Sequence, residues 1–395
     1  MTIRPDTAPL PQPAPSAPLP LAGIKVADFS RVLAGPLVTM VLADLGAEVV
    51  KVEQPGIGDE TRHWKPPTWG GVSTYFLSVN RNKRGMALDL GDVGDLAAAR
   101  QLATSADVLV ENFRPGWMAR KGLGYDELRA ANPSLVYCSI SAFGADGAAA
   151  EIAGYDLLVQ AMSGLMHITG PSDGDPTKVG VAVVDVVTGL YALSGILAAL
   201  TARERDPDRA GTHVEVSLFD AALASLVNQA SGVVLGGADP SRDGNRHPSI
   251  APYEVVHGSD RPFVVAAAND RLFHRLCTVV GRDDLVDDPR FATNQQRRAH
   301  VDELIATLEA TLTTRPADAW IGRLQAAGVP AGPINTIPEA IAWADEMGMQ
   351  PLTGDPHNGF AAVRSPLRFN GQLLTSCVAP PPLAAGSDPT APGAA

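Results

Sequence analysis

Between positions 23 and 140, short apolar runs alternate with helical segments, and this alternation constrains the fold more than any other feature. Strands are predicted at 24–28, 48–52, 107–110 and 135–140, with helices at 36–45 and 92–105. A chain that alternates in this way forms a parallel sheet with helices on both faces. The predicted fold class is therefore α/β, with a Rossmann-like large domain whose functional groups lie in the loops at the carboxyl ends of the strands.

Length and composition indicate a globular protein with room for two domains. The chain has 395 residues, of which 45% are hydrophobic and 19% charged. Its formal net charge is -12, from 31 basic and 43 acidic side chains. Nucleic acids and anionic membranes bind basic surfaces, so neither is expected as the main partner. An anionic ligand must then be held by local positive groups.

The cysteines and the termini bear on cellular location. Cys138, Cys277 and Cys377 are scattered without metal-ligand spacing, which predicts reduced thiols in the cytoplasm. Residues 1–20 are rich in Pro and Ala and lack the pattern of a signal peptide, so a disordered arm is predicted there. Residues 376–395 predict a disordered tail. No apolar run reaches the roughly 20 residues of a membrane span, so no membrane association is expected.

Asp185 is the pivot of an apolar stretch from 154 to 200. The run from 179 to 184 lacks helical spacing and predicts a buried strand, whereas the apolar residues after Asp185 recur at helical intervals. A carboxylate at such a strand-to-helix junction faces backbone N–H groups and the positive end of the helix dipole, which favour its ionised, nucleophilic form. An ordinary N-cap explains the same position, and local spacing alone favours that alternative.

Five loops follow the predicted strands, and four of them carry basic residues. They are RVLAGP at 31–36, VEQPGIGDETR at 52–62, NRNKR at 80–84, ENFRPG at 111–116 and SAFG at 141–144. Arg and Lys at strand ends suit phosphate groups, although solvated loop charges explain each of them singly. The phosphate-loop pattern GxxxxGK[ST] does not occur, and no GxGxxG follows the first strand, so neither nucleotide fingerprint is present.

Together these loops and the central stretch resemble the family III CoA-transferases, also called the CaiB/BaiF family. The resemblance rests on RVLAGPLVTMVLADLGAEVVKVEQPGIGDETR, YFLSVNRNKRGMALDL, DVLVENFRPG, VYCSISAFG and the central GYD and VVD motifs, which follow in order through residues 21–370. The segments LSVNRNK, GLMHITGPSDGDP, VAVVDVVTGLYA and SIAPYEVV are most similar to the succinyl-CoA:glutarate branch. The resemblance implies transfer of CoA from an acyl-CoA, succinyl-CoA, to a dicarboxylic acid, with CoA thioesters as substrates and no permanently bound cofactor or metal.

The resemblance assigns the family's nucleophile to Asp185. In the family this carboxylate attacks the thioester to form a mixed anhydride and then an aspartyl-CoA thioester, which survives only while water is excluded. Tyr155 falls on the site tyrosine beside the thioester. The CoA- and substrate-binding positions carried over are Arg31, Leu33, Ala34, Gln54, Leu88, Asp89, Asn112, Phe113 and Arg120. A dicarboxylic acid needs a further cation for its second carboxylate, and the candidates are Arg31, Arg62, Arg114 and Arg246.

The resemblance also divides the chain into domains. It implies a large CoA-binding catalytic domain at 21–224, a smaller α+β domain at 225–327 and a segment at 328–375 that returns to the large domain. Within the smaller domain a hairpin is predicted at 253–257 and 263–267, with helices at 271–280, 297–312 and 317–327. Two chains of the family interlock as rings, so a homodimer is expected.

Two other functions fit the same residues. A 2-methylacyl-CoA racemase shares this fold and keeps the aspartate, but it has a histidine where this chain has Tyr155. Removing and returning a proton at one carbon needs two acid–base groups, and a tyrosine is a weak base. The second alternative is a non-catalytic CoA-binding protein, against which the retention of Asp185 speaks.

Overall fold

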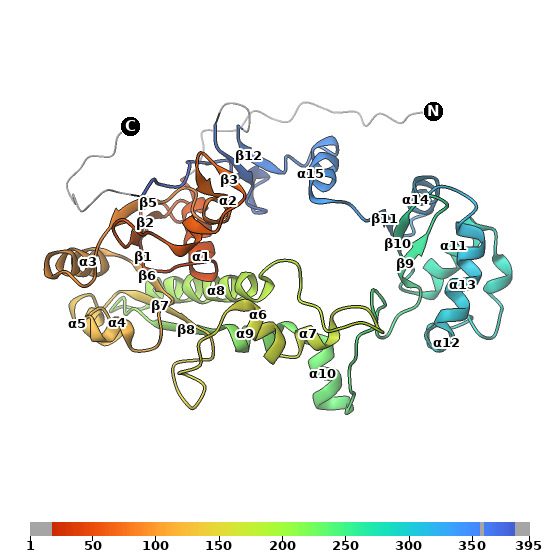
Figure 1. The fold of residues 1–395 in the computed structure, drawn as a ribbon, viewed down its shortest axis with the longest axis horizontal. Coiled ribbons are helices and arrows are strands. Elements are labelled where there is room, and N and C mark those ends of the chain that lie inside the picture. The colour runs from red at the N-terminus through yellow and green to blue at the C-terminus, as the bar shows by residue number, and fades with distance from the viewer. Residues whose placement is uncertain (1–17, 356–358, 384–395) are drawn as a thin grey trace. The chain divides into compact units, whose positions relative to one another are not determined.

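The structure is a computed structural model that describes residues 18–355 and 359–383 (Figure 1). The chain forms two compact units, and each is described by itself. The sheet unit contains the described parts of 1–156, 183–225 and 352–395, and the hairpin unit contains 157–182 and 226–351.

A six-stranded parallel sheet organises the sheet unit. Its strands, in spatial order, are β5 (Arg84–Ala87), β2 (Glu48–Glu53), β1 (Lys25–Asp28), β6 (Val108–Glu111), β7 (Val136–Ser141) and β8 (His213–Ser217). Every neighbouring pair in this order is parallel. The central strand β6 is buried along its whole length, as expected for a parallel sheet covered on both faces. The predicted α/β class is therefore confirmed.

Helices cover the two faces of this sheet. On one side α3 (Val93–Ser105) and α5 (Tyr125–Ala131) share a buried apolar cluster with alternate strand residues such as Ala27 and Leu109. On the other side α1 (Ala34–Asp44) and α8 (Val183–Arg205) pack together. A Cβ on Gly189 of α8 would lie 3.0 Å from the carbonyl oxygen of Ala34, so glycine permits this close approach.

The remaining elements of the sheet unit are short. They are η1 (Glu60–His63), β3 (Thr68–Trp69), β4 (Val72–Ser73), α2 (Thr74–Ser78), α4 (Trp117–Arg120), α9 (Leu218–Ser225), β12 (Leu352–Gly354), β13 (Ala361–Val363), β14 (Arg368–Phe369) and β15 (Gln372–Leu373). Several of them follow the carboxyl ends of the sheet strands, where α/β proteins build their sites.

The hairpin unit is built on a three-stranded antiparallel sheet. Strand β10 (Pro262–Ala266) lies between β9 (Tyr253–His257) and β11 (Ala331–Pro333). Its helices are α7 (Leu165–Ile168), α10 (Val227–Gly236), α11 (Asp270–Val280), α12 (Asn294–Ala299), α13 (Val301–Leu312), α14 (Ala317–Ala326) and α15 (Ile337–Glu346), while α6 (Asp156–Met162) runs into it from the sheet unit. The predicted hairpin is present. The predicted helix at 297–312 is broken at His300, which caps α13.

Three sequence predictions differ from the structure. The segments 157–182 and 328–351 belong to the hairpin unit, although the sequence assigned them to the large domain and to a return segment. The predicted strand at 179–184 is wrong, because α8 already begins at Val183. Part of the predicted disordered tail is ordered: Val378 exchanges two hydrogen bonds with Asn82, through Oδ1 at 2.7 Å and the backbone N–H at 3.0 Å. The predictions for 1–17 and 384–395 lie outside the described residues.

By length and composition alone, one helix of the described chain is long and apolar enough to cross a membrane, although Asp185 interrupts its apolar sequence. Helix α8 passes that test in the described chain, with a mean hydropathy of 1.9, and α9 with α10 pass it if counted as one bent span. Core helices of soluble proteins pass the same test, and α8 contacts α1, β7 and β8.

Candidate active site

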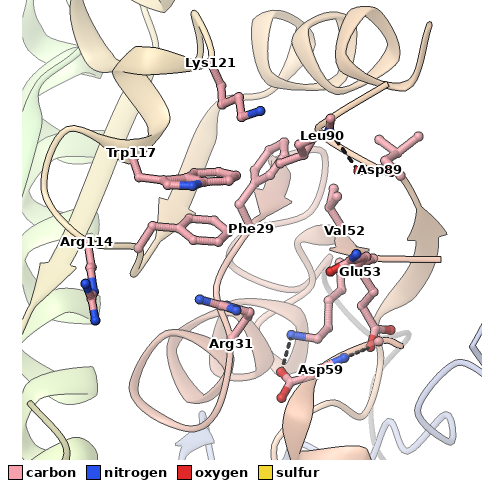
Figure 2. Close-up of a pocket in the computed structure, with 16 residues that line it drawn as sticks. Phe29, Arg31, Val52, Glu53, Asp59, Asp89, Leu90, Arg114, Trp117 and Lys121 are labelled. Carbon is pink, nitrogen blue, oxygen red and sulfur yellow. Dashed lines mark hydrogen bonds and ion pairs between the residues drawn. The ribbon is translucent and has the colours of Figure 1, made fainter. Parts of the chain in front are cut away.

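Two cavities lie at the carboxyl ends of the parallel strands, both within the sheet unit. The first, of about 340 Å³, is lined by residues that include Gln54, Leu88, Asp89, Trp117 and Lys121. The second, of about 240 Å³, is lined by residues that include Leu33, Ala34, Asn112, Tyr155 and Asp185. Arg31, Phe113 and Arg114 line both cavities and therefore form a shared wall. Figure 2 shows Arg31 and Arg114 in the first cavity. We call the first the CoA-side cavity, after the ligand that the resemblance of the sequence implies, and the second the aspartate cavity.

Asp185 lies in the first turn of α8 rather than at a strand-to-helix junction. It is not the cap of that helix. The cap interaction comes from Asp156, whose Oδ1 accepts hydrogen bonds from the N–H groups of Val184 at 2.8 Å and of Asp185 at 3.4 Å. One carboxylate thus satisfies the helix end, and a second, Asp185, faces the aspartate cavity.

The charge state of Asp185 also differs from the sequence expectation. Burial, with the nearby Asp156 carboxylate as a second cause, raises its pKa to about 7. Within the described residues Asp185 makes no ion pair, so no cation opposes these two effects. The favourable helix dipole that the sequence suggests is therefore outweighed by desolvation and like-charge repulsion. At neutral pH the group is poised between its acid and its nucleophilic carboxylate.

Two tyrosines lie near this aspartate, and sequence reasoning found only one of them. Tyr155 lines the aspartate cavity and is 60% exposed. Tyr75 of α2 was missed. Burial, followed by the charges of Asp185, Asp156 and Asp59, raises the pKa of Tyr75 to about 12, and its ring packs edge-on against Trp64. Tyr75 therefore remains a neutral phenol beside the aspartates, and no local motif signals this position.

The loop from Ser30 to Pro36 forms one wall of the aspartate cavity. Val32 adopts a left-handed backbone conformation with φ of 69°, which is unfavourable for a β-branched residue. Its N–H donates to Oδ2 of Asp59 at 3.2 Å. Asn112 forms two hydrogen bonds with the backbone of Arg31, the residue before Val32. Its Oδ1 accepts from the Arg31 N–H, and its Nδ2 donates to the Arg31 carbonyl, each at 2.8 Å. Asn112 thus joins two strand-end loops.

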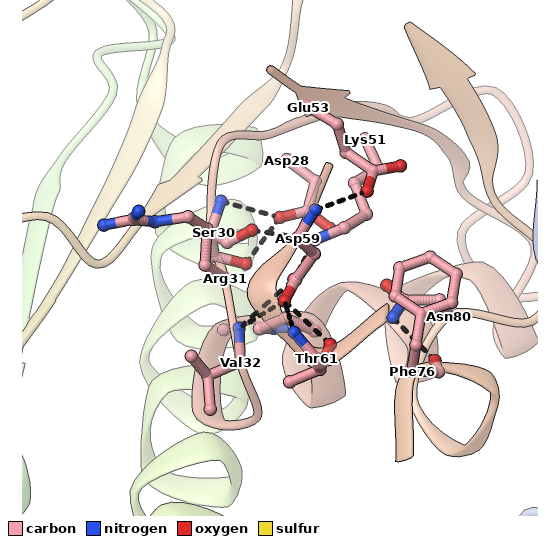
Figure 3. A network of polar contacts seen from close by, with 12 residues as sticks. Asp28, Ser30, Arg31, Val32, Lys51, Glu53, Asp59, Thr61, Phe76 and Asn80 are labelled. Atoms are coloured by element: carbon pink, nitrogen blue, oxygen red, sulfur yellow. Dashed lines mark hydrogen bonds and ion pairs between the residues drawn. The ribbon is translucent and has the colours of Figure 1, made fainter. Parts of the chain in front are cut away.

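A network of buried lysine and aspartate side chains stabilises the loop from Ser30 to Pro36 (Figure 3). The Lys51 ammonium lies 3.0 Å from Asp59 and donates to the Ser30 carbonyl at 2.8 Å. The Lys83 ammonium lies 3.0 Å from Asp28, which also accepts from Ser30 and Thr39. The side chains of both lysines and both aspartates are fully buried.

Buried ion pairs also show that several bases of the strand-end loops are not phosphate ligands, contrary to the interpretation from the sequence. Arg62 pairs with Glu53 at 2.7 Å, and Arg81 pairs with Asp44 at 2.5 Å, all with less than a tenth of each side chain exposed. With Lys83 they account for most of the bases in two of the five loops. Their charges are neutralised inside the protein, so they stabilise the loops and do not reach a ligand. Sequence alone does not separate these bases from those on the cavity walls.

The CoA-side cavity combines aromatic rings with basic groups. Phe113 stacks on Trp117 with ring centroids 4.2 Å apart and planes 19° from parallel. The Arg31 guanidinium lies 4.7 Å from the centre of the Phe113 ring, and the Lys121 ammonium 5.8 Å from that of Trp117. Such a wall suits an aromatic base that carries phosphates. Of the predicted positions, Arg120 does not line either cavity; it is exposed on α4 beside Lys121, which does.

Glu111 lies at the end of β6, where the ENFRPG loop begins, and was not predicted as a site residue. It is 7% exposed, and its Oε2 accepts from the Phe113 N–H at 2.8 Å. Burial raises its pKa to about 7, although hydrogen bonds from Ser139 and from the Phe113 backbone oppose the shift. Ser139 in turn lies 2.9 Å from the ring nitrogen of His213. Glu111 therefore anchors the loop that carries Phe113 and Arg114.

The arrangement provides a half-buried carboxylate of raised pKa in one cavity and an aromatic, basic cavity beside it. Among the residues that the structure describes, no group of three His, Cys, Asp or Glu side chains could hold a metal ion. The chemistry that the site offers is covalent catalysis by a carboxylate next to a ligand with a phosphate and an aromatic ring.

Comparison with known proteins agrees with this geometry. The sequence model of CoA-transferase family III matches residues 21–388. The chain is 39% identical to the succinyl-CoA:glutarate CoA-transferase of Mus musculus, over 92% of this chain and 84% of that protein. It is 46% identical to the acetyl-CoA:oxalate CoA-transferase of Acetobacter aceti, over 81% and 82%. It is 44% identical to the succinate–glutarate CoA-transferase of Agrobacterium fabrum, over 83% of each.

Two solved structures share the fold. A CaiB/BaiF family protein from Brucella suis superposes with a TM-score of 0.81 at 41% identity, covering 92% of this chain and 96% of that one. A protein from Mycobacterium tuberculosis gives a TM-score of 0.82 at 32% identity, covering 92% and 97%. Because the family match spans the residues of both units, the chain belongs to CoA-transferase family III and is a CoA-transferase.

Proposed function

We propose that this enzyme moves CoA from succinyl-CoA to a dicarboxylic acid through a covalent aspartyl-CoA intermediate on Asp185. The observation that carries the proposal is the shared wall: Asp185 lines a cavity that borders the CoA-side cavity along Arg31, Phe113 and Arg114. A ligand in the CoA-side cavity could therefore present its thioester to this carboxylate.

The steps balance without any further reactant. The Asp185 carboxylate attacks the thioester carbonyl, the C–S bond breaks, and CoA leaves as a thiolate. The thiolate then attacks the aspartyl carbonyl of the mixed anhydride, which forms aspartyl-CoA and releases the donor acid as its carboxylate. The acceptor carboxylate repeats both steps in reverse and leaves as the new acyl-CoA. Each intermediate keeps the thioester energy only while water is excluded.

In this proposal CoA occupies the CoA-side cavity. Its adenine ring lies near the stacked Phe113 and Trp117, and its phosphates near Lys121, which we propose in place of the predicted Arg120. Gln54, Leu88 and Asp89 line the same cavity. Leu33, Ala34 and Tyr155 border the reacting thioester in the aspartate cavity.

The assembly and location belong to the same proposal. Helices α10 and α15 have no buried residue among those described, and they expose large apolar side chains such as Leu235 and Ile337. Apolar surface of this kind supports a homodimer as its cover. The three cysteines are free, which agrees with a cytoplasmic protein. CoA thioesters are the substrates, with no permanently bound cofactor.

The decisive experiment traps the intermediate. Wild-type enzyme mixed with succinyl-CoA and no acceptor should carry a CoA adduct on the Asp185 peptide, detected by mass spectrometry. Asp185→Asn should fold, bind CoA and lose transfer by several orders of magnitude, on the order of the loss when a nucleophile is removed. The racemase alternative predicts no adduct, but exchange of the 2-hydrogen of a 2-methylacyl-CoA with deuterated solvent. Exchange without an adduct would overturn the proposal.

A further inference from the structure

The four arginines that the sequence offers for a second carboxylate divide into two pairs. Arg62 forms a buried bidentate pair with Glu53, through hydrogen bonds of 2.8 and 2.7 Å, and also donates to the Pro381 carbonyl. Arg246 lies in the hairpin unit, where it pairs with Glu254 at 3.2 Å and Asp302 at 2.7 Å. Both guanidinium groups are already neutralised, so neither offers a free charge to a substrate.

Arg31 and Arg114 differ from Arg62 and Arg246 both in their position and in their lack of an acidic partner among the described residues. Each lines the aspartate cavity and the CoA-side cavity, the second of which is drawn in Figure 2, and each side chain is exposed. Neither guanidinium forms an ion pair in the part of the chain that the structure describes. Arg31 is held in place through its backbone by Asn112 and through its side chain by the Phe113 ring. Two guanidinium groups are therefore presented at the boundary between the cavities.

The other charges of the aspartate cavity make these arginines necessary for an anionic substrate. Its lining includes Glu60, Glu151 and Asp185, and its cationic side chains are Arg31 and Arg114. An acid with two carboxylates that entered a cavity of acidic groups alone would meet only repulsion. Arginine is also the side chain that matches the planar fork of a carboxylate, because it can donate two parallel hydrogen bonds.

We propose that Arg31 and Arg114 bind the carboxylate of the acyl group that does not react, and so make this enzyme specific for dicarboxylic acids. The inference rests on the proposed function, since it assumes that the reacting carboxyl group is activated at Asp185. Donor and acceptor acids occupy the same position in turn, so one arginine pair serves both. The acids in the names of the relatives, glutarate and oxalate, each have two carboxyl groups.

The arginines could instead bind a phosphate of CoA, because they also line the CoA-side cavity. Two donors that carry the same CoA but different acyl groups distinguish binding of a CoA phosphate from binding of the distal carboxylate. Succinyl-CoA and butyryl-CoA have four-carbon acyl groups and differ in the distal carboxylate. On the acceptor side, glutarate and pentanoate form the matching five-carbon pair.

The variants are Arg114→Gln and Arg31→Gln, each assayed with both donors and both acceptors. The control is Arg205→Gln, an equal change of charge at an exposed residue of α8. It lies 20 residues from Asp185 along that helix, which is about 30 Å. If an acid without a distal carboxylate is not turned over, its inhibition constant replaces its KM.

Removal of either arginine should raise the KM for succinyl-CoA and glutarate about 10- to 100-fold, the worth of hydrogen bonds to a charged group. The values for butyryl-CoA and pentanoate should change less than about threefold, as should all values for Arg205→Gln. An equal rise for both donors would assign the arginines to the CoA phosphates, and no rise would remove them from binding; either result overturns the inference. Adduct formation on Asp185 with butyryl-CoA tests the proposed function separately.

Discussion

Two groups of acidic side chains lie within the sheet unit, and their surroundings shift the pKa of Asp28 and that of Asp185 in opposite directions. Beneath the loop from Ser30 to Pro36, burial opposes ionisation of Asp28, but Lys83, Lys51 and two hydroxyl groups lower its pKa to about 2. At the start of α8, burial and Asp156 raise the pKa of Asp185 to about 7. The same residue type is thus stabilised as an anion in one place and destabilised as an anion in the other.

The difference shows where the protein uses charge for structure and where for chemistry. In the network each anion has a cation within 3.0 Å, so the charges stabilise one geometry of the loop. Asp185 forms no ion pair with any residue that the structure describes, and the free energy of its anion stays high. A carboxylate anion of high energy is a better nucleophile and forms a mixed anhydride more readily, which is what the first step of the proposed mechanism requires.

The largest expected effect comes from breaking the network. Lys83→Met should destabilise the protein by about 3–5 kcal/mol, because it leaves the fully buried Asp28 without its closest cation. Urea denaturation at neutral pH measures the loss. The matched control is Arg114→Met, an exposed arginine without an ion pair in the described chain, which should shift Tm by less than about 2 °C. Equal effects of the two variants would remove the distinction between the two regions.

The sequence predicts four of the six strands of the sheet, because their signal is local, and it misses β5 and β8. Short apolar runs at 24–28, 48–52, 107–110 and 135–140 each correspond to a strand with an error of one residue at either end. The run at 179–184 was predicted wrongly for a physical reason. Its Val-rich composition suits a strand, but Asp156, a residue 28 positions away, caps the helix that begins at Val183.

The site was predicted in part. Ten of the eleven predicted positions, among them Asp185, Tyr155 and Phe113, line one cavity or the other, because motifs at strand ends converge on one edge of a parallel sheet. What could not be predicted is which loop base is buried. The ion pairs of Arg62 with Glu53 and of Arg81 with Asp44 depend on tertiary contacts that local sequence does not encode.

Glu111 gives a second test of the comparison between paired and unpaired carboxylates, because it is buried and has no ion pair among the described residues. Its folded pKa of about 7 lies above the usual unfolded value of about 4.3. The folded state therefore binds more protons between these values, and its stability falls as pH rises from about 4 to 7. At pH 8 Glu111→Gln should be more stable than the wild type by up to about 3 kcal/mol, and at pH 4 the two should be equal.

Denaturation curves of the wild type and of Glu111→Gln at pH 4, 6 and 8 give the difference between their free energies of unfolding. The titration of Asp185 is common to both proteins, so it cancels in this difference. The control is Glu48→Gln, an exposed glutamate at the start of β2. A difference that does not depend on pH would mean that Glu111 is not buried as an acid. The glutamine can still accept from the Phe113 N–H, so the loop should keep its shape.

The smallest expected effect is a change in kcat/KM of about tenfold for each pH unit, caused by the titration of Asp185. In the proposed mechanism only the ionised carboxylate attacks the thioester, so kcat/KM should rise about tenfold per unit as pH increases towards 7 and level off above it. Asp156→Asn removes the neighbouring charge but keeps a side-chain oxygen that can cap α8. The midpoint of its profile should therefore move to lower pH. Succinyl-CoA is the suitable donor, because a distal carboxyl group with an ordinary pKa of about 4.3 is already mostly ionised above pH 5. A profile that is flat from pH 5 to 8 in the wild type would mean that the helix dipole keeps Asp185 ionised, and the contrast with Asp28 would then disappear.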